Sequence, residues 1–338
     1  MTEPAQERSA RLRRVRRWLG FAVIGIALYI VAPTLAGVYG ALGAVADLDP
    51  RWLVVIIACE VAHLVCTWDL LRVALRTRSW LLVATSQLAS NAVGIVLPAG
   101  AAAGAATQHQ MLRGGGIDPT RSASSLTAVS LLTTGSVFAL PVLALPVVLA
   151  GAPVPGQLQY AMWLGALAFV VLAVGGTVLL LADAPLEAVG RLIERVGNRF
   201  RPEGSGLEGL PVRLVDERDL IRRSLGEHWW RVILLTIGRM AFDYLTLLAA
   251  LAAVGAHPHP SLVLIAFAVT EVLALLPITP GGLGVVEASL AATLAIAGVD
   301  AGSALVATAA YRLVTFWLPL PAGVVAAVIH RRRFGRFR

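Results

Sequence analysis

The stretch LPITPGGLGVVEASL, from Leu276 to Leu290, places two prolines, three glycines and one carboxylate inside one of the most apolar parts of the chain. Proline removes a backbone donor, and glycine permits tight turns that other residues resist. Irregular backbone at membrane depth is tolerated only where it is buried in protein or lines a cavity. The stretch therefore predicts a membrane helix that is broken at depth, with Glu287 beside the break.

The composition excludes a soluble protein. Of the 338 residues, 57% are hydrophobic and 14% are charged, and the mean hydropathy is +0.77. Several segments reach the roughly 20 apolar residues that cross a bilayer. The net charge of +8 comes from arginines between these segments, which favours membrane topology over nucleic-acid binding as its cause. We expect an all-α polytopic membrane protein with an inverted-topology repeat.

The apolar segments divide into full spans and broken ones. Six full spans are predicted at 18–40, 52–75, 122–149, 159–182, 229–255 and 302–329. Two further segments, 80–112 and 261–297, are interrupted near their centres, and each half is too short to cross alone. These two segments are therefore predicted to be re-entrant helical hairpins.

The arginines orient this arrangement. With the N-terminus in the cytoplasm, the arginine-rich loops fall on the cytoplasmic side, as the positive-inside rule requires, only if both hairpins re-enter. We expect a multi-pass protein of the cytoplasmic membrane with both termini in the cytoplasm. The predicted units are a basic N-terminus, a first membrane half, an amphipathic linker, a second membrane half and a basic tail, at 1–17, 18–182, 183–228, 229–330 and 331–338.

The linker contains the amphipathic segment LEAVGRLIERVGNRF, residues 186–200. Its arginines and apolar side chains suit a helix lying on the cytoplasmic surface near lipid headgroups. A solvated linker helix is the alternative interpretation.

The two broken segments align with each other without a gap. A shift of 182 residues pairs Pro98 with Pro280, Gly100 with Gly282, Gly116 with Gly298 and Asp118 with Asp300. Under the predicted topology the two halves run in opposite directions. Paired interruptions in inverted repeats are typical of a transport site near the midplane.

The break itself suits an anion. Pro280, Gly281, Gly282 and Gly284 would end one helix, and the next would begin near Leu283 with its free N–H groups pointing into the membrane interior. Two interpretations of Glu287 are compatible: it caps its own helix, or it is a protonatable group on a transport route.

Other polar residues lie within the spans. Arg239 and Asp243, four apart, are predicted to pair on one helix face. Arg312 lies near the predicted midplane and is expected to pair with Glu287 or with a substrate phosphate. Glu271 lies on the first arm of the second hairpin. The second span carries three further polar residues, Glu60, His63 and Asp69.

These features resemble a known family. PGGLGVVE (280–287), YR (311–312) and WLPLPAG (317–323) are similar to the C-terminal signature of the lysylphosphatidylglycerol synthase transmembrane-region family of flippase-like proteins. That family includes the membrane half of the bacterial enzyme that makes and flips aminoacylated phosphatidylglycerol. The resemblance implies lipid translocation, with the signature residues as its site.

The chain also departs from the family pattern. No aminoacyl-transferase domain follows the membrane part, so we expect a stand-alone member that is not an enzyme. Asn91 is present in the first hairpin, but the charged residues common there in relatives are replaced by PAGAAAGAAT. The nearest polar residues are Gln108 and His109. No metal-ligand spacing or nucleotide loop is visible, so no metal or cofactor is expected.

The leading hypothesis is a flippase or scramblase for an anionic phospholipid, glycolipid or polyprenyl-linked lipid. Substrate binding is assigned to Pro280, Gly281, Gly282, Gly284, Glu287, Arg312, Arg239 and Asn91, and coupling to Glu287, Asp243 and Glu271. The alternatives are a proton- or ion-coupled carrier of a small solute and a membrane scaffold that does not transport. The expected partner is a lipid with an anionic headgroup, and a homo-oligomer is possible.

Overall fold

The computed structural model describes residues 48–97, 100–149, 156–200, 229–276 and 279–335, together with a few positions between 212 and 219. The predicted first span, 18–40, lies outside the described residues. Within them the chain is helical, and no strand occurs in these ranges. The predicted all-α membrane class is confirmed.

Four helices of the described residues are long and apolar enough to cross a bilayer, and a fifth span results if the bent α6–α7 pair is counted. The long helices are α2 (Pro50–Leu75), α5 (Pro119–Leu149), α6 (Gly156–Leu181), α9 (Trp229–Ala253) and the pair α12 (Ala301–Arg312) and α13 (Pro319–Phe334). These positions agree with five of the six predicted spans.

Helix starts follow from local capping. The Asp49 side chain accepts a hydrogen bond from the Arg51 N–H at 2.9 Å, and Pro50 opens α2. Asp300 caps α12 in the same way by accepting from the Ser303 N–H at 3.1 Å. Each cap satisfies a backbone donor that the first helical turn leaves free.

The last span is not one continuous helix. Between α12 and α13 the chain forms a π-helical turn, η2 (Leu313–Trp317), directly after Arg312. The predicted span over 302–329 is present as Ala301–Phe334, and the π-turn within it was not predicted. The prolines of WLPLPAG remove backbone donors, and a π-turn accommodates their loss. The helix then continues beyond residue 330, through Arg331 to Phe334, into what was predicted to be the tail.

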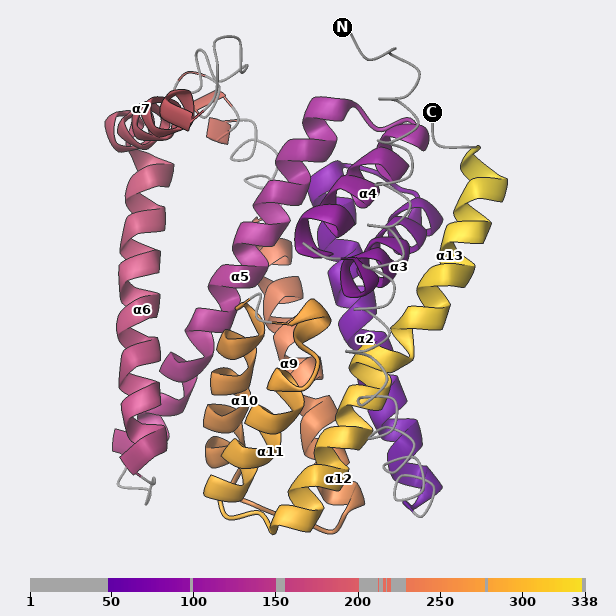
Figure 1. The fold of residues 1–338 in the computed structure, drawn as a ribbon, viewed down its shortest axis with the longest axis vertical. Coiled ribbons are helices and arrows are strands. Elements are labelled where there is room, and N and C mark those ends of the chain that lie inside the picture. The colour runs from indigo at the N-terminus through magenta and orange to yellow at the C-terminus, as the bar shows by residue number, and fades with distance from the viewer. Residues whose placement is uncertain are drawn as a thin grey trace, which may run out of the picture.

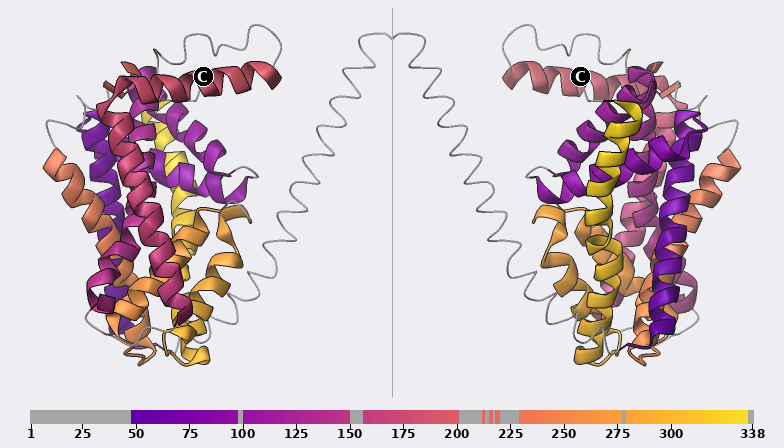
Figure 2. Two further views of the ribbon diagram at one scale, coloured as in Figure 1. Left: turned by 90° about the vertical axis from the view of Figure 1, so that its left-hand side faces the viewer. Right: turned by 90° about the vertical axis from the view of Figure 1, so that its right-hand side faces the viewer.

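The linker helix leaves the bundle. Helix α7 (Asp183–Phe200) is bent by 103° from α6 and lies across one end of the molecule (Figures 1 and 2). The predicted amphipathic segment is therefore helical and stands across the direction of the spans, as a surface helix would.

The two broken segments form helical hairpins at opposite ends of the molecule (Figure 1). One consists of α3 (Trp80–Val96) and α4 (Gly100–Gly114), and the other of α10 (Pro260–Ala274) and α11 (Val285–Ile296). Their tips meet, because α3 contacts the short helix η1 (Pro280–Gly282) of the second hairpin. Both predicted segments are therefore helical hairpins, and their re-entry into a membrane stays a prediction.

The flanking spans are inverted. Helix α2 packs along α9, and Figure 1 shows that the two run in opposite directions. Helix α5 and the α12–α13 pair also run in opposite directions. The arginine-rich ends of α2, α4 and α13 lie at the same end of the molecule as α7, whereas the first turn of α2, which contains Arg51, lies at the other. This distribution agrees with the charge asymmetry on which the topology was predicted.

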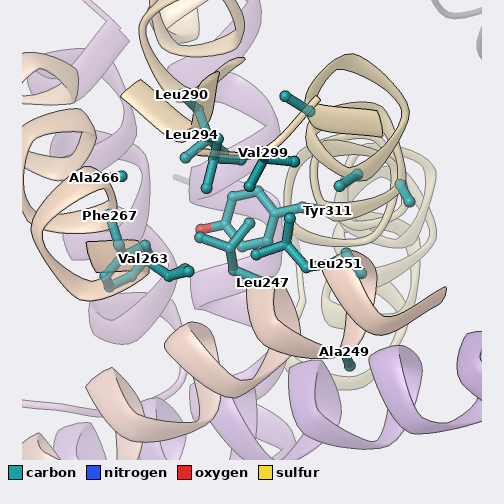
Figure 3. Packing of buried hydrophobic residues seen from close by; sticks show 14 of the residues in the cluster. Leu247, Ala249, Leu251, Val263, Ala266, Phe267, Leu290, Leu294, Val299 and Tyr311 are labelled. Atoms are coloured by element: carbon teal, nitrogen blue, oxygen red, sulfur yellow. The ribbon is translucent and has the colours of Figure 1, made fainter. Parts of the chain in front are cut away.

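The largest apolar core lies in the half that contains the second hairpin. Side chains from α9, α10, α11 and α12 surround the ring of Tyr311, among them Leu247, Phe267, Leu290 and Leu294 (Figure 3). Lipid tails are as apolar as leucine, so close packing rather than escape from water stabilises such a core. This packing fixes the second hairpin against α9 and α12.

Candidate functional site

The tip of the second hairpin is built by glycines in the left-handed region. Gly281 has a φ of 63°, and Gly282 and Gly284 have φ values of 70° and 79°. Only glycine adopts this conformation at little cost. A methyl group on Gly281 would also lie 2.9 Å from the Phe316 ring. Glycine is therefore favoured at these three positions by the backbone conformation, and at Gly281 also because a side chain would clash with Phe316.

Glu287 joins the broken backbone to the last span. Its Oε2 accepts a hydrogen bond from the Gly284 N–H at 2.7 Å, which caps α11, and its Oε1 accepts from Arg312 Nε at 2.7 Å. The predicted cap and the predicted pairing with Arg312 thus occur together. The charged pair sits at the N-terminus of α11, where the helix dipole favours an anion.

Arg312 is held from several directions. The residue is 8% exposed, its guanidinium lies 4.1 Å from the centre of the Phe316 ring, and Nη2 donates to the Gly281 carbonyl at 3.4 Å. The π-turn places Phe316 against both the hairpin tip and this arginine. Cation–π attraction at a desolvated position contributes about 1–2 kcal/mol.

Arg239 and Asp243 do not form the predicted ion pair. Arg239 donates to Ser136 Oγ on α5 at 3.3 Å, and Asp243 accepts a hydrogen bond from the Tyr311 hydroxyl at 2.8 Å. His63 contacts both, through the Arg239 carbonyl at 3.0 Å and the Asp243 carboxylate at 3.9 Å. Both side chains therefore hydrogen-bond to residues of neighbouring helices and not to each other.

Two further carboxylates face this network. Asp243 acts electrostatically on Glu60 of α2, and Asp243, Arg239 and Arg312 act on Glu271 of α10. Glu60 is 5% exposed. The fold therefore gathers the residues of the second half that were predicted to bind or couple into one polar cluster, and it adds Glu60 and His63 of α2 to them.

Not every predicted residue joins the cluster. Asn91 lies exposed on α3, and the described side chains provide no contact that links it to Arg312. His109 of the first hairpin lies 3.0 Å from Ser122 Oγ instead. Asp69 forms a separate site towards the arginine-rich end, where it accepts from Arg72 at 2.7 Å and from Arg231 at 3.2 Å.

Sequence reasoning missed three residues that shape the site: Tyr311, Phe316 and Ser136. The tyrosine was visible as part of the Tyr-Arg pair, but nothing in the sequence shows that its hydroxyl reaches Asp243. Phe316 contacts Arg312 because of the π-turn, and Ser136 contacts Arg239 through packing of α5 on α9.

The described residues contain no group of three or more metal-ligating side chains that could hold a metal ion. The site is instead a set of arginines and carboxylates at the meeting point of two inverted, broken hairpins. Fold and site together define a polytopic helical membrane protein with a polar centre. The chain belongs to the family described as the lysylphosphatidylglycerol synthase TM region, which it matches over residues 17–323.

A curated relative is also similar to part of the chain. A stretch of 99 residues is 30% identical to a UPF0104 membrane protein of Methanothermobacter thermautotrophicus. The match covers 29% of this chain and 28% of that relative, so it spans less than a third of either protein.

Proposed function

We propose that this protein is a lipid transporter that moves a lipid with an anionic headgroup across the cytoplasmic membrane. One observation carries the proposal: Arg312 and the N-terminus of α11, which Glu287 caps, meet between two hairpins at opposite ends of the molecule. Arginine and helix N-termini are the groups that bind phosphate most readily. Membership of a family described by a lipid-synthase membrane region supports a lipid-related role.

The geometry suggests how an anion would bind. Arg312 donates through Nε to Glu287, whose other oxygen holds the Gly284 N–H. A headgroup phosphate would compete with the Glu287 carboxylate for these donors. Displacing Glu287 exchanges one charge-assisted contact for another, so the exchange need not expose an unpaired arginine.

The hairpin tips favour a lipid over a small solute. Val96 and Leu97 at the first tip, and Leu275 and Leu276 at the second, are each at least 40% exposed. Large apolar side chains at the surface of a membrane protein contact lipid tails. A lipid could therefore keep its tails beside the tips while its headgroup reaches Arg312.

Transport can be measured with purified protein in liposomes containing a fluorescent phospholipid and a membrane-impermeant quencher. We expect rapid transfer of an anionic phospholipid between leaflets, slower transfer of phosphatidylcholine, and at least about tenfold loss in Arg312→Ala, since a hydrogen bond to a charged group contributes about 1.5–3 kcal/mol. Arg231→Ala is the matched control, because Arg231 pairs with Asp69 away from the cluster.

Other outcomes would contradict the proposal. Unchanged transfer in folded Arg312→Ala would exclude this site. Absence of transfer for every lipid tested, with uptake of a soluble anion, would favour a solute carrier. Loss of folding in both Arg312→Glu and Glu287→Arg, restored when the two are combined, would favour a structural pair in a scaffold.

A further inference from the structure

The polar cluster that contains the Arg312–Glu287 pair has more acidic than basic groups. Among the described residues, its fixed cations are Arg239 and Arg312, and its carboxylates are Glu60, Asp243, Glu271 and Glu287. Full ionisation would leave two negative charges without a compensating arginine. A buried charge without a partner is so costly that the group takes up a proton instead.

Two of the four carboxylates have donors that hold the ionised form. Glu287 accepts from Arg312 Nε and from the Gly284 N–H. Asp243 accepts from the Tyr311 hydroxyl and lies 3.9 Å from the His63 ring. Hydrogen bonds and cations directed at a carboxylate stabilise its charge. These two carboxylates therefore have hydrogen-bond partners within the cluster.

The other two carboxylates lack such donors. Glu60 is 5% exposed, and neither the Glu60 nor the Glu271 side chain makes a hydrogen bond to the described part of the chain. The charge that acts on Glu60 is the negative one of Asp243. Glu271 faces Asp243 and Arg239 from α9 and Arg312 from α12, with Tyr311 as a further neighbour.

We infer that Glu60 and Glu271 form a proton-binding site, and that Glu271 couples its proton to the anion site at Arg312. In this assignment Glu271 carries a proton while Arg312 remains paired with Glu287, the contact that the structure shows. Loss of the proton from Glu271 gives Arg312 a second carboxylate to attract it, in competition with any bound phosphate. A proton on Glu271 and an anionic headgroup on Arg312 therefore favour each other, and this coupling is reciprocal.

The coupling rests on the proposed function, whereas the proton site does not. Infrared spectroscopy of the purified protein in nanodiscs of ether-linked phosphatidylcholine, which has no ester carbonyl, tests the site, since a carboxylic acid has a C=O stretching band that a carboxylate lacks. We expect this band at neutral pH, with a shift in D2O. Glu60→Gln and Glu271→Gln should each remove part of it, and the double variant should remove it.

The control is Glu187→Gln, because Glu187 lies on α7 outside the cluster and pairs with Arg191. Absence of the band in the wild-type protein, a measurement that needs no variant, would overturn the proton site. Persistence of the full band in the folded double variant would overturn it as well.

Liposomes with an imposed pH difference test the coupling. We expect the transfer of anionic phospholipid to depend on the pH difference in the wild-type protein and to lose that dependence in Glu271→Gln. Lipid transfer that ignores the gradient in the wild type would refute the coupling and leave lipid transport standing. No lipid transfer together with the expected infrared bands would refute the proposed function and leave the proton site standing.

Discussion

The two hairpins occupy equivalent places in the inverted repeat but are built from different chemistry. In the first, α3 and α4 approach so closely that a methyl group on Gly100 would lie 1.7 Å from the Gly94 carbonyl oxygen. In the second, the tip is opened by left-handed glycines and carries Glu287. The repeat places Ala105 opposite Glu287 and Ser130 opposite Arg312.

This difference indicates a division of labour between the halves. Close backbone contact through small residues is a common way to hold helices together in lipid, where burial from water contributes little. The first hairpin therefore acts as a packed support for the tip of the second. The second hairpin carries the charges, the cap and the contacts with the last span.

The largest expected effect is the loss of stability caused by a substitution in the first hairpin. Gly100→Ala should destabilise the protein by more than about 3 kcal/mol, since the added methyl meets backbone that no rotamer can move away. Gly114→Ala on the same helix is the control, because a methyl there meets nothing within 4 Å. Thermal unfolding in detergent, followed by circular dichroism, measures both. Equal stability of the two variants would contradict the close-packed hairpin.

The second effect breaks the charged pair. Glu287→Gln and Arg312→Gln should each cost about 2 kcal/mol, which is less than for a fully buried pair because the Glu287 side chain is 25% exposed. Each should also abolish lipid transfer. The double variant should cost less than the sum of the two, since the residues interact directly.

Ser130→Ala, at the repeat position of Arg312, should change neither the stability nor the transfer rate. A loss of transfer there comparable to that of Arg312→Gln would mean that the first half also contributes to the anion site.

The sequence was sufficient for the fold class, the hairpins and their inversion, because these follow from apolar lengths, prolines and arginine positions. It also predicted Glu287 as one of two partners for Arg312, because both residues fall in the membrane interior in the predicted topology. The contacts of Arg239 and Asp243 were not predictable, because packing among α2, α5, α9 and α12 decides them. The π-turn after Arg312 was likewise hidden, because the proline that follows it fits an ordinary helix start as well.

The third prediction separates the cost of the backbone conformation from the cost of a steric contact at the tip of the second hairpin. Gly281→Ala should cost more than Gly298→Ala, although both glycines have positive φ values, of 63° and 93°. The left-handed conformation costs roughly 1–2 kcal/mol for alanine at either position. Only at Gly281 does the methyl also meet the Phe316 ring, whereas at Gly298 it meets nothing within 4 Å. Equal unfolding temperatures would show that Phe316 moves aside freely.

The smallest expected effect comes from removing one buried hydroxyl near each hairpin: Thr85 within the first, and Tyr311 next to the second. Thr85 on α3 lies 2.9 Å from His330 Nδ1, and Tyr311 beside the second hairpin donates to Asp243 at 2.8 Å. Thr85→Val and Tyr311→Phe should each cost about 1 kcal/mol of stability, since each removes a buried hydroxyl that hydrogen-bonds to another side chain.

Their effects on lipid transfer should differ. Tyr311→Phe takes a donor from Asp243, which makes its negative charge less stable beside Glu60 and Glu271, and should therefore alter the pH dependence of transfer. Thr85 lies in the first hairpin, so Thr85→Val should leave the pH dependence of transfer unchanged. If Thr85→Val shifted the pH profile as much as Tyr311→Phe, the two hairpins would share the titrating site, and the division between support and chemistry would be lost.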